Sequence, residues 1–348
     1  MHVDRSLEHD PTDPASAQRH AASAARAGYS RLYTAETTHD PFLPIALAAG
    51  AGEIELGTNI AVAFARTPMT LAKTAHDLQS LTGGRFVLGL GSQVRAHVTR
   101  RFSMPWSSPA ARMREYLQAL HAIWDCWESG APLAFDGEFY THNLTAPLFN
   151  PPAHGHGAPK ILLAAVGPLM TKVAGEVADG VLCHAFSSAS YIENVTLPAV
   201  REGLAASGRH GDRFEVGMPL LVATGVAGAD LTRDVERIRG QIAFYASTPA
   251  YAGVLEHHGW ADLHRDLLAL SREQRWTEMN ALVDDDVLQH FCVIAQADEL
   301  ADAIIDRFGT VLTNVRLSVP YADDPETWLP VIDRLASHPA ADPAAVPA

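Results

Sequence analysis

Three side chains suited to proton transfer lie close together in one short segment of the sequence. Glu36, His39 and Asp40 fall within five positions, directly after a short β-like run at residues 31–35. Carboxylate and imidazole groups are common acids and bases in enzymes, and the ordinary histidine pKa of about 6.5 suits chemistry near neutral pH. We predict catalytic roles for Glu36 and His39, with His39 as the proton donor or acceptor. The alternative is that Asp40 or Thr38 caps the next helix and that His39 is a surface residue.

Three further segments are rich in glycine, small side chains and hydrogen-bond donors. They span residues 57–68, 89–97 and 164–170, and each begins within or directly after a short apolar run. Glycine permits a bulge and the close approach of a flat ligand, and the free N–H groups of a helix N-terminus favour a phosphate. Ordinary turn chemistry is the competing explanation for each segment.

These segments fall where the strands of a β/α barrel would end. Short apolar runs alternate with helical patterns in about eight units, from a strand near residues 2–3 to a helix and strand over residues 298–317. Apolar side chains recur at helical spacing through residues 109–127, after a Ser-Pro pair typical of helix starts. Eight units favour an α/β fold of the (β/α)8 TIM-barrel type, which places chemistry at the C-terminal ends of its strands. A doubly wound open sheet is the alternative, because local pattern does not show closure.

We expect one barrel domain over residues 1–337 with two insertions. The chain has 348 residues, whereas such barrels typically have about 250. The surplus lies near residues 133–159, which indicate a hairpin and loop, and near residues 247–297, whose tryptophans and histidines indicate a helical lid. Residues 338–348, rich in Pro and Ala, are expected to form a disordered tail.

Composition limits the partners and the compartment. Lys and Arg number 26 against 40 Asp and Glu, a net charge of −14, which makes nucleic acid and anionic membrane surfaces poor partners. No run approaches the roughly 20 apolar residues of a membrane span, and the start of the chain lacks a secretory pattern. Three widely spaced cysteines indicate reduced thiols, so we expect a cytoplasmic protein.

Several common signatures are missing from the sequence. Residues 89–94 lack the third glycine of a dinucleotide-binding GxGxxG motif, and the chain has no Walker A, GxSxG or HExxH motif. His154 and His156 have no third ligand at a sensible spacing, so we expect no metal site.

In their order along the chain, the segments resemble the bacterial luciferase-like flavin monooxygenases. The resemblance is closer to the branch that uses the deazaflavin coenzyme F420. It is carried most specifically by ELGT at residues 55–58, LTGGRF at 81–86, LGLG at 88–91 and AGEVADG at 174–180, together with FDGEFY at 135–140.

The resemblance implies a barrel with a cofactor ring at its C-terminal mouth, a non-prolyl cis peptide at a bulge after the third strand, and usually a homodimer. It implies these cofactor-binding positions: Glu36, Asn59, Ile60, Val62, Gly91, Ser92, Gln93, His97, Ala165, Val166, Gly167, Pro168 and Met170. Many relatives have histidine where this chain has Thr37, and sugar-phosphate dehydrogenases of the branch have glutamate at Val94. The usual proton donor and substrate therefore do not carry over.

We expect an F420-dependent oxidoreductase that transfers hydride between the deazaflavin and a small organic substrate. One alternative is an FMN-dependent monooxygenase that takes reduced flavin from a partner reductase and uses dioxygen. Another is a non-catalytic flavin-binding protein. The phosphate-side segment has only Lys172 nearby, which favours the singly charged phosphodiester of F420 over the phosphomonoester of FMN.

Overall fold

Eight parallel strands close into a barrel in the computed structural model, which describes residues 1–210, 213–224, 230–318, 325–339 and 341–342. The strands are β1 (His2–Ser6), β2 (Arg31–Thr34), β3 (Glu55–Thr58), β5 (Phe86–Gly91), β8 (Lys160–Ala165), β9 (Gly180–Cys183), β10 (Glu215–Thr224) and β12 (Asn314–Ser318). The barrel closes because β12 pairs with β1, with Val315 beside Val3. The predicted TIM barrel is confirmed, and the open-sheet alternative is wrong.

The strands are apolar on both faces because each face is covered. β2, β5 and β9 are buried along their whole lengths. One face of each strand points into the lumen and the other packs against helices, the usual situation in an all-parallel sheet. Between β3 and β5, the short strand β4 (Ala61–Val62) pairs with the end of β5.

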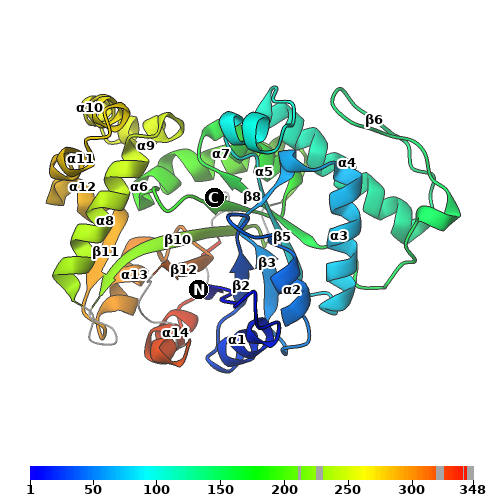
Figure 1. Cartoon of the computed structure of the whole chain (residues 1–348), viewed down its shortest axis with the longest axis horizontal. Helices are drawn as coiled ribbons and strands as arrows, with labels where there is room; N and C mark the ends of the chain where they lie inside the picture. Colours follow the sequence, from blue (N-terminus) through cyan, green and yellow to red (C-terminus); the bar gives the residue numbers. More distant parts are fainter. Residues whose placement is uncertain (211–212, 225–229, 319–324, 340, 343–348) are drawn as a thin grey trace.

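An outer layer of helices surrounds the strands (Figure 1). It contains α1 (Ala15–Arg26), α2 (Leu43–Ala48), α3 (Pro68–Leu81), α4 (Pro109–Ser129), α5 (Pro168–Val177), α6 (Ala189–Tyr191), α7 (Leu197–Ala206), α8 (Leu231–Ala246), α13 (Leu300–Phe308) and α14 (Leu329–Ala336). α3 begins where its sequence indicates a start, since the Thr67 side chain accepts a hydrogen bond from the Thr70 N–H and Pro68 occupies the first turn. α4 buries the face that carries its helically spaced apolar residues, including Met113, Leu117 and Trp124.

Two segments add to this frame. Residues 133–159 contain an antiparallel hairpin, β6 (Phe135–Asp136) and β7 (Thr141–His142), which extends from one side of the molecule (Figure 1). Residues 247–297 contain α9 (Ala252–His257), α10 (Ala261–Arg272), α11 (Trp276–Leu282), α12 (Asp285–Phe291) and β11 (Cys292–Ala295). β11 pairs with the second half of β10, and the helices pack around α8 in a hydrophobic cluster separate from the main core.

Most of the tail predicted to be disordered, residues 338–348, lies outside the described residues. Within the described ranges, no helix has both the length and the apolar character needed to cross a bilayer.

Candidate active site at the mouth of the barrel

The end of β3 forms a bulge that packs directly on β5. The peptide bond between Asn59 and Ile60 is cis, as the resemblance implies for residues 59–61. A Cβ at Gly91 would lie 2.9 Å from Ile60 Cδ1, and a Cβ at Gly89 would lie 1.8 Å from the Thr58 carbonyl oxygen. Glycine is therefore required at Gly89, where the contact is with backbone, whereas a side chain at Gly91 would force Ile60 to shift.

Glu36 is bound to the segment that follows this bulge. Its carboxylate accepts hydrogen bonds from Arg66 Nη1 (2.7 Å) and Nη2 (2.8 Å) and from the Val62 N–H (2.7 Å). Arg66 also donates to the Val62 carbonyl oxygen (2.9 Å). The side chains are 9% (Glu36) and 19% (Arg66) exposed, so this is a partly buried, bidentate ion pair. The arrangement positions the bulge, a role for Glu36 that the sequence interpretation missed.

The rest of this loop lies at the surface. Asp40 Oδ1 accepts hydrogen bonds from the N–H groups of Phe42 (2.8 Å) and Leu43 (3.1 Å), and so caps the start of α2. His39 is exposed, and its ring lies edge-on to His9 with centroids 6.0 Å apart. Both features agree with the alternative interpretation of the segment. The catalytic role of His39 stays a prediction.

The loop after β5 is held in a tight turn beside the loop after β2. Gln93 adopts a left-handed conformation with φ 59°, and its side-chain oxygen accepts a hydrogen bond from the Val94 N–H (3.0 Å). Ser92 Oγ donates to the Gln93 carbonyl oxygen (3.1 Å). His97 is exposed at the start of a helical turn whose last residue, Arg101, donates to the Thr37 carbonyl oxygen (2.5 Å). Two predicted cofactor-contact segments are thus joined.

The predicted phosphate-side segment leads from β8 into α5. Ala165 is buried and Met170 is partly buried, whereas Gly167 and Pro168 are exposed. No side chain caps the helix in the described structure, and a Cβ at Gly167 would have no described atom within 4 Å. The Val166 carbonyl oxygen accepts a hydrogen bond from the Tyr191 hydroxyl (3.1 Å), which fixes the loop next to the segment after β9.

A histidine that the sequence interpretation missed follows β9 directly. The His184 ring stacks on Tyr251 (centroids 4.3 Å apart, 25° between planes) and lies edge-on to Tyr245 (4.7 Å). His184 Nδ1 accepts a hydrogen bond from the Phe186 N–H (3.1 Å), which places the ring proton on Nε2. Burial lowers the pKa of His184 to about 4, so the ring is a neutral donor at neutral pH. Strand alternation is the sequence feature that could have identified His184, since positions 180, 182 and 184 lie on the same face of β9.

The lumen has an apolar layer with charges below it. Tyr33, Val87, Leu162 and Leu182 pack together across the barrel. Nearer the strand starts, Arg31 pairs with Glu55 and with Glu215 (2.9 Å). Lys160 Nζ also lies 2.5 Å from a Glu215 carboxylate oxygen.

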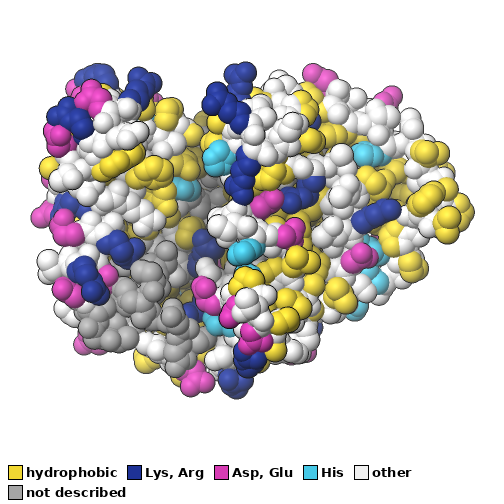
Figure 2. Space-filling view, in the orientation of Figure 1, with side chains coloured by type: hydrophobic (Ala, Val, Ile, Leu, Met, Phe, Trp, Pro, Cys, Tyr) yellow, Lys and Arg dark blue, Asp and Glu magenta, His cyan; other side chains and the backbone are white. Residues whose placement is uncertain are grey.

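Arg316, on β12, is a further lumen cation. Its guanidinium lies 6.0 Å from the ring centroid of Tyr33, and no hydrogen bond or ion pair to it occurs among the described residues. Figure 2 shows a hollow in one face of the molecule, between the side formed by α8 to α12 and the side formed by α2 and α3.

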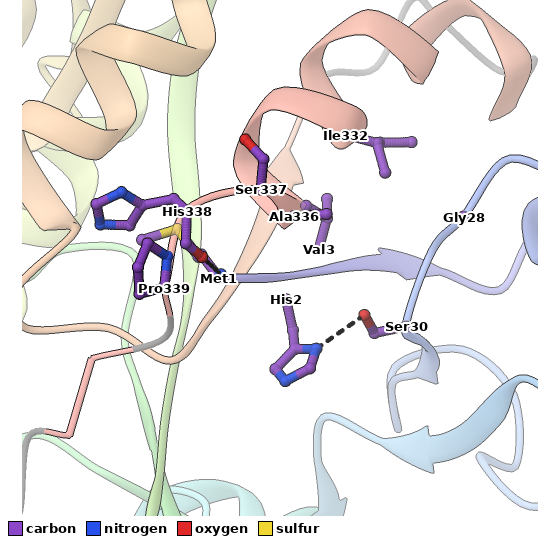
Figure 3. A pocket seen from close by; sticks show the side chains of 10 residues that line it. All are labelled: Met1, His2, Val3, Gly28, Ser30, Ile332, Ala336, Ser337, His338 and Pro339. Atoms are coloured by element: carbon purple, nitrogen blue, oxygen red, sulfur yellow. Dashed lines mark hydrogen bonds between the residues drawn. The ribbon is translucent and has the colours of Figure 1, made fainter.

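Two other features lie away from this mouth. A pocket of about 390 Å³ is found at the opposite end of the barrel, where His2 Nδ1 lies 3.2 Å from Ser30 Oγ (Figure 3). Where α3 and α4 meet the loop before β8, potential ligand atoms of His76, Glu128 and His154 lie within 4.8 Å of one another. The sequence interpretation found no third ligand for His154 because His76 and Glu128 come from α3 and α4. That no metal binds stays a prediction.

Comparison with known proteins supplies relatives over most of the chain. An uncharacterised protein of Mycobacterium tuberculosis is 48% identical over 306 residues, covering 88% of this chain and 90% of that protein. The 5,10-methylenetetrahydromethanopterin reductase of Methanopyrus kandleri is 25% identical over 296 residues, covering 80% of this chain and 81% of the reductase.

Solved structures share the fold. The coenzyme F420-dependent tetrahydromethanopterin reductase from Methanopyrus kandleri superposes with a TM-score of 0.74 at 20% identity, covering 94% of this chain and 96% of the reductase. EDTA monooxygenase from Chelativorans gives a TM-score of 0.73 at 16% identity, covering 97% and 94%. A family model described as luciferase-like monooxygenase matches residues 1–314, and this chain therefore belongs to that family.

Proposed function

We propose that the protein is an F420-dependent oxidoreductase that acts on a small organic substrate at the mouth of its barrel. The relatives include a methylenetetrahydromethanopterin reductase that is similar over most of both chains. A bound deazaflavin would supply or accept a hydride at its C5 atom. The protein's part is to hold the ring, exclude water and place the substrate.

The residues after β3 and β5 fit a flat ring. Ile60 lies against Gly91, where an added Cβ would come within 2.9 Å of Ile60 Cδ1. The absence of a side chain at Gly91 keeps this surface shallow and apolar. Glu36 and Arg66 hold the same segment from behind, through the Val62 N–H and carbonyl groups.

The observation that carries the choice of cofactor is the start of α5. Its first turn offers N–H groups with no side-chain cap in the described structure. Lys172, the one cation of α5, is already paired with Glu202 on α7 (2.5 Å). Backbone N–H groups without a free lysine suit the single charge of a phosphodiester better than the double charge of a phosphomonoester.

Titration of the apo-protein with F420 and with FMN at matched salt tests the proposal. We expect micromolar or tighter binding of F420, followed by change in cofactor absorbance, and no comparable binding of FMN. The reverse preference would support the FMN-dependent monooxygenase, which is favoured by the family description and needs a partner reductase. Binding without turnover of any acceptor would support the third alternative, a non-catalytic flavin-binding protein.

A glycine variant connects the binding to this site. Gly91→Ala should weaken F420 binding at least tenfold, because its Cβ would displace Ile60. Gly217→Ala is the control in the same barrel, since its Cβ would meet Leu182 Cδ2 at an ordinary 3.4 Å.

We also propose that the protein is a cytoplasmic homodimer. Light scattering checks the oligomeric state, and fractionation of cells checks the compartment.

A further inference from the structure

Two hydrogen-bond donors at the mouth have no partner among the described residues. They are the Arg316 guanidinium and the Nε2–H of His184. We propose that they form a substrate subsite for a small oxo- or hydroxy-carboxylate. Arg316 binds the carboxylate, and His184 donates to the carbonyl or hydroxyl oxygen. The proposal rests on the proposed function, because it names the class of substrate for that reaction.

Arg316 differs from the other cations of the lumen. Arg31 and Lys160 are both paired with Glu55 and Glu215. The Arg316 guanidinium carbon lies over the Tyr33 ring, 6.0 Å from the ring centroid, and Arg316 forms no ion pair within the described part of the chain. A largely buried guanidinium without hydrogen bonds is costly, and a carboxylate is the ligand that satisfies its planar donors in pairs.

An acid on the neighbouring strand β1 forms no ion pair with Arg316 among the described residues. Asp4 lies beside Arg316 in the β1–β12 register, but no ion pair joins the two side chains. Its carboxylate accepts a hydrogen bond from Asn314 Nδ2 (3.2 Å). Burial raises the pKa of Asp4 to about 7, so this acid is only partly ionised at neutral pH. A positive charge therefore remains available to an anionic ligand.

The two donors converge on the same region of the mouth. β9 and β12 both flank β10, which separates their backbones by about 10 Å. Tyr245 connects them, since its ring lies 4.7 Å from His184 and its hydroxyl is within electrostatic range of Arg316. This region adjoins the lumen layer that contains Tyr33 and Leu182, since the Arg316 guanidinium lies 6.0 Å from the Tyr33 ring centroid.

The neutral state of His184 decides what it can bind. An imidazole that donates from Nε2 and accepts at Nδ1 carries no charge, so it favours a neutral oxygen over a second anion. In the reductive direction, bound reduced F420 would supply a hydride to the carbonyl carbon, and the π electron pair would move to the oxygen, which would take a proton from solvent. His184 polarises the carbonyl as a hydrogen-bond donor.

The test measures binding by calorimetry, with apo-protein and with F420-loaded protein. The probes are pyruvate, acetoacetate and levulinate, in which the carbonyl lies one, two or three carbons from the carboxylate, and their neutral amides. We expect at least one acid to bind more tightly than its amide, and Arg316→Gln to weaken that acid at least tenfold without weakening F420. Arg265→Gln, which removes an exposed charge on α10, is the matched control and should change nothing.

Two further variants keep the test decisive. Arg316→Lys retains the charge without paired donors and should bind the acid with intermediate affinity, even where Arg316→Gln fails to fold. His184→Phe should lower affinity for the oxo-acid to that of the alkyl acid of equal length. Failure of all three acids to bind the wild-type protein, or equal binding to Arg316→Gln, would overturn the proposal. Because the acids are also titrated into the apo-protein, a failure of F420 to bind is distinguished from a failure of the proposed subsite.

Discussion

At the scale of single residues, the Glu36–Arg66 pair connects the ends of two neighbouring strands. Glu36 follows β2 and Arg66 follows β4, and both bind the backbone of Val62. An ion pair with three hydrogen bonds to one carboxylate, only 9% exposed, cannot lose one charge without leaving the other poorly solvated. Its role is to fix the bulge on which a cofactor ring would rest.

Glu36→Gln should therefore lower the free energy of unfolding by about 2–4 kcal/mol, measured by urea denaturation. F420 affinity should fall with it, because the segment at Ile60 loses its support. Asp302→Asn is the control, since Asp302 pairs with Arg334 at an exposed site, where such pairs contribute about 0–1 kcal/mol. Equal effects of the two substitutions would contradict a positioning role for Glu36.

At the scale of elements, α5 and α7 cross at a contact between two glycines. A Cβ at Gly203 would lie 2.1 Å from the Lys172 carbonyl oxygen, and a Cβ at Gly175 would lie 2.3 Å from the Val200 carbonyl oxygen. These contacts are with backbone, which a rotamer change cannot relieve. The crossing holds the uncapped start of α5 at its place in the mouth.

Gly203→Ala should destabilise the protein by about 1–3 kcal/mol, because the two helix backbones must separate. Gly240→Ala, in α8, is the matched substitution, since its Cβ would meet only the Asn280 side chain at 3.3 Å. There the better helix propensity of alanine should leave stability unchanged or raised. Thermal denaturation of both variants checks the comparison, and a stable Gly203→Ala protein would show that the crossing is not tight.

At the scale of the whole molecule, stability should respond to pH through Asp4. Burial raises its pKa from the ordinary 3.8 to about 7. Between these values the folded protein keeps a proton that the unfolded chain has released, so this group makes folding less favourable as pH rises. Asp4→Asn removes the effect. Its stability relative to wild type should increase from pH 4 to pH 7 by up to about 4 kcal/mol.

His184 acts in the opposite sense over an overlapping range. Burial lowers the pKa of His184 from 6.5 to about 4. The contribution of this group to the free energy of unfolding is therefore fully present above pH 6.5 and is lost as the pH falls toward 4. Denaturation of wild type and Asp4→Asn across pH 4–8 separates the two effects. A constant difference between the two proteins would mean that the Asp4 carboxyl is not protonated in the folded state.

The sequence predicted what local pattern controls. Strand ends, glycine turns and the proline start of α4 depend on neighbouring residues, so the barrel and its four candidate segments could be predicted. Glu36 was identified but not its partner Arg66, because that contact spans 30 positions. His184 and Arg316 were missed for the same reason: their surroundings come from α8, Tyr251 and Tyr33, which only the closed barrel brings together.

The separate core of α9 to α12 has a consequence for how such a protein can evolve. Leu255, Leu267 and Phe291 pack with Ile238 and Ile242 of α8, in a cluster distinct from the main core of the barrel. Substitutions there can alter the wall beside Tyr251 while the strands keep their packing. This helical unit could therefore change in sequence from one relative to another while the strands and the loops after β3 and β5 keep their arrangement.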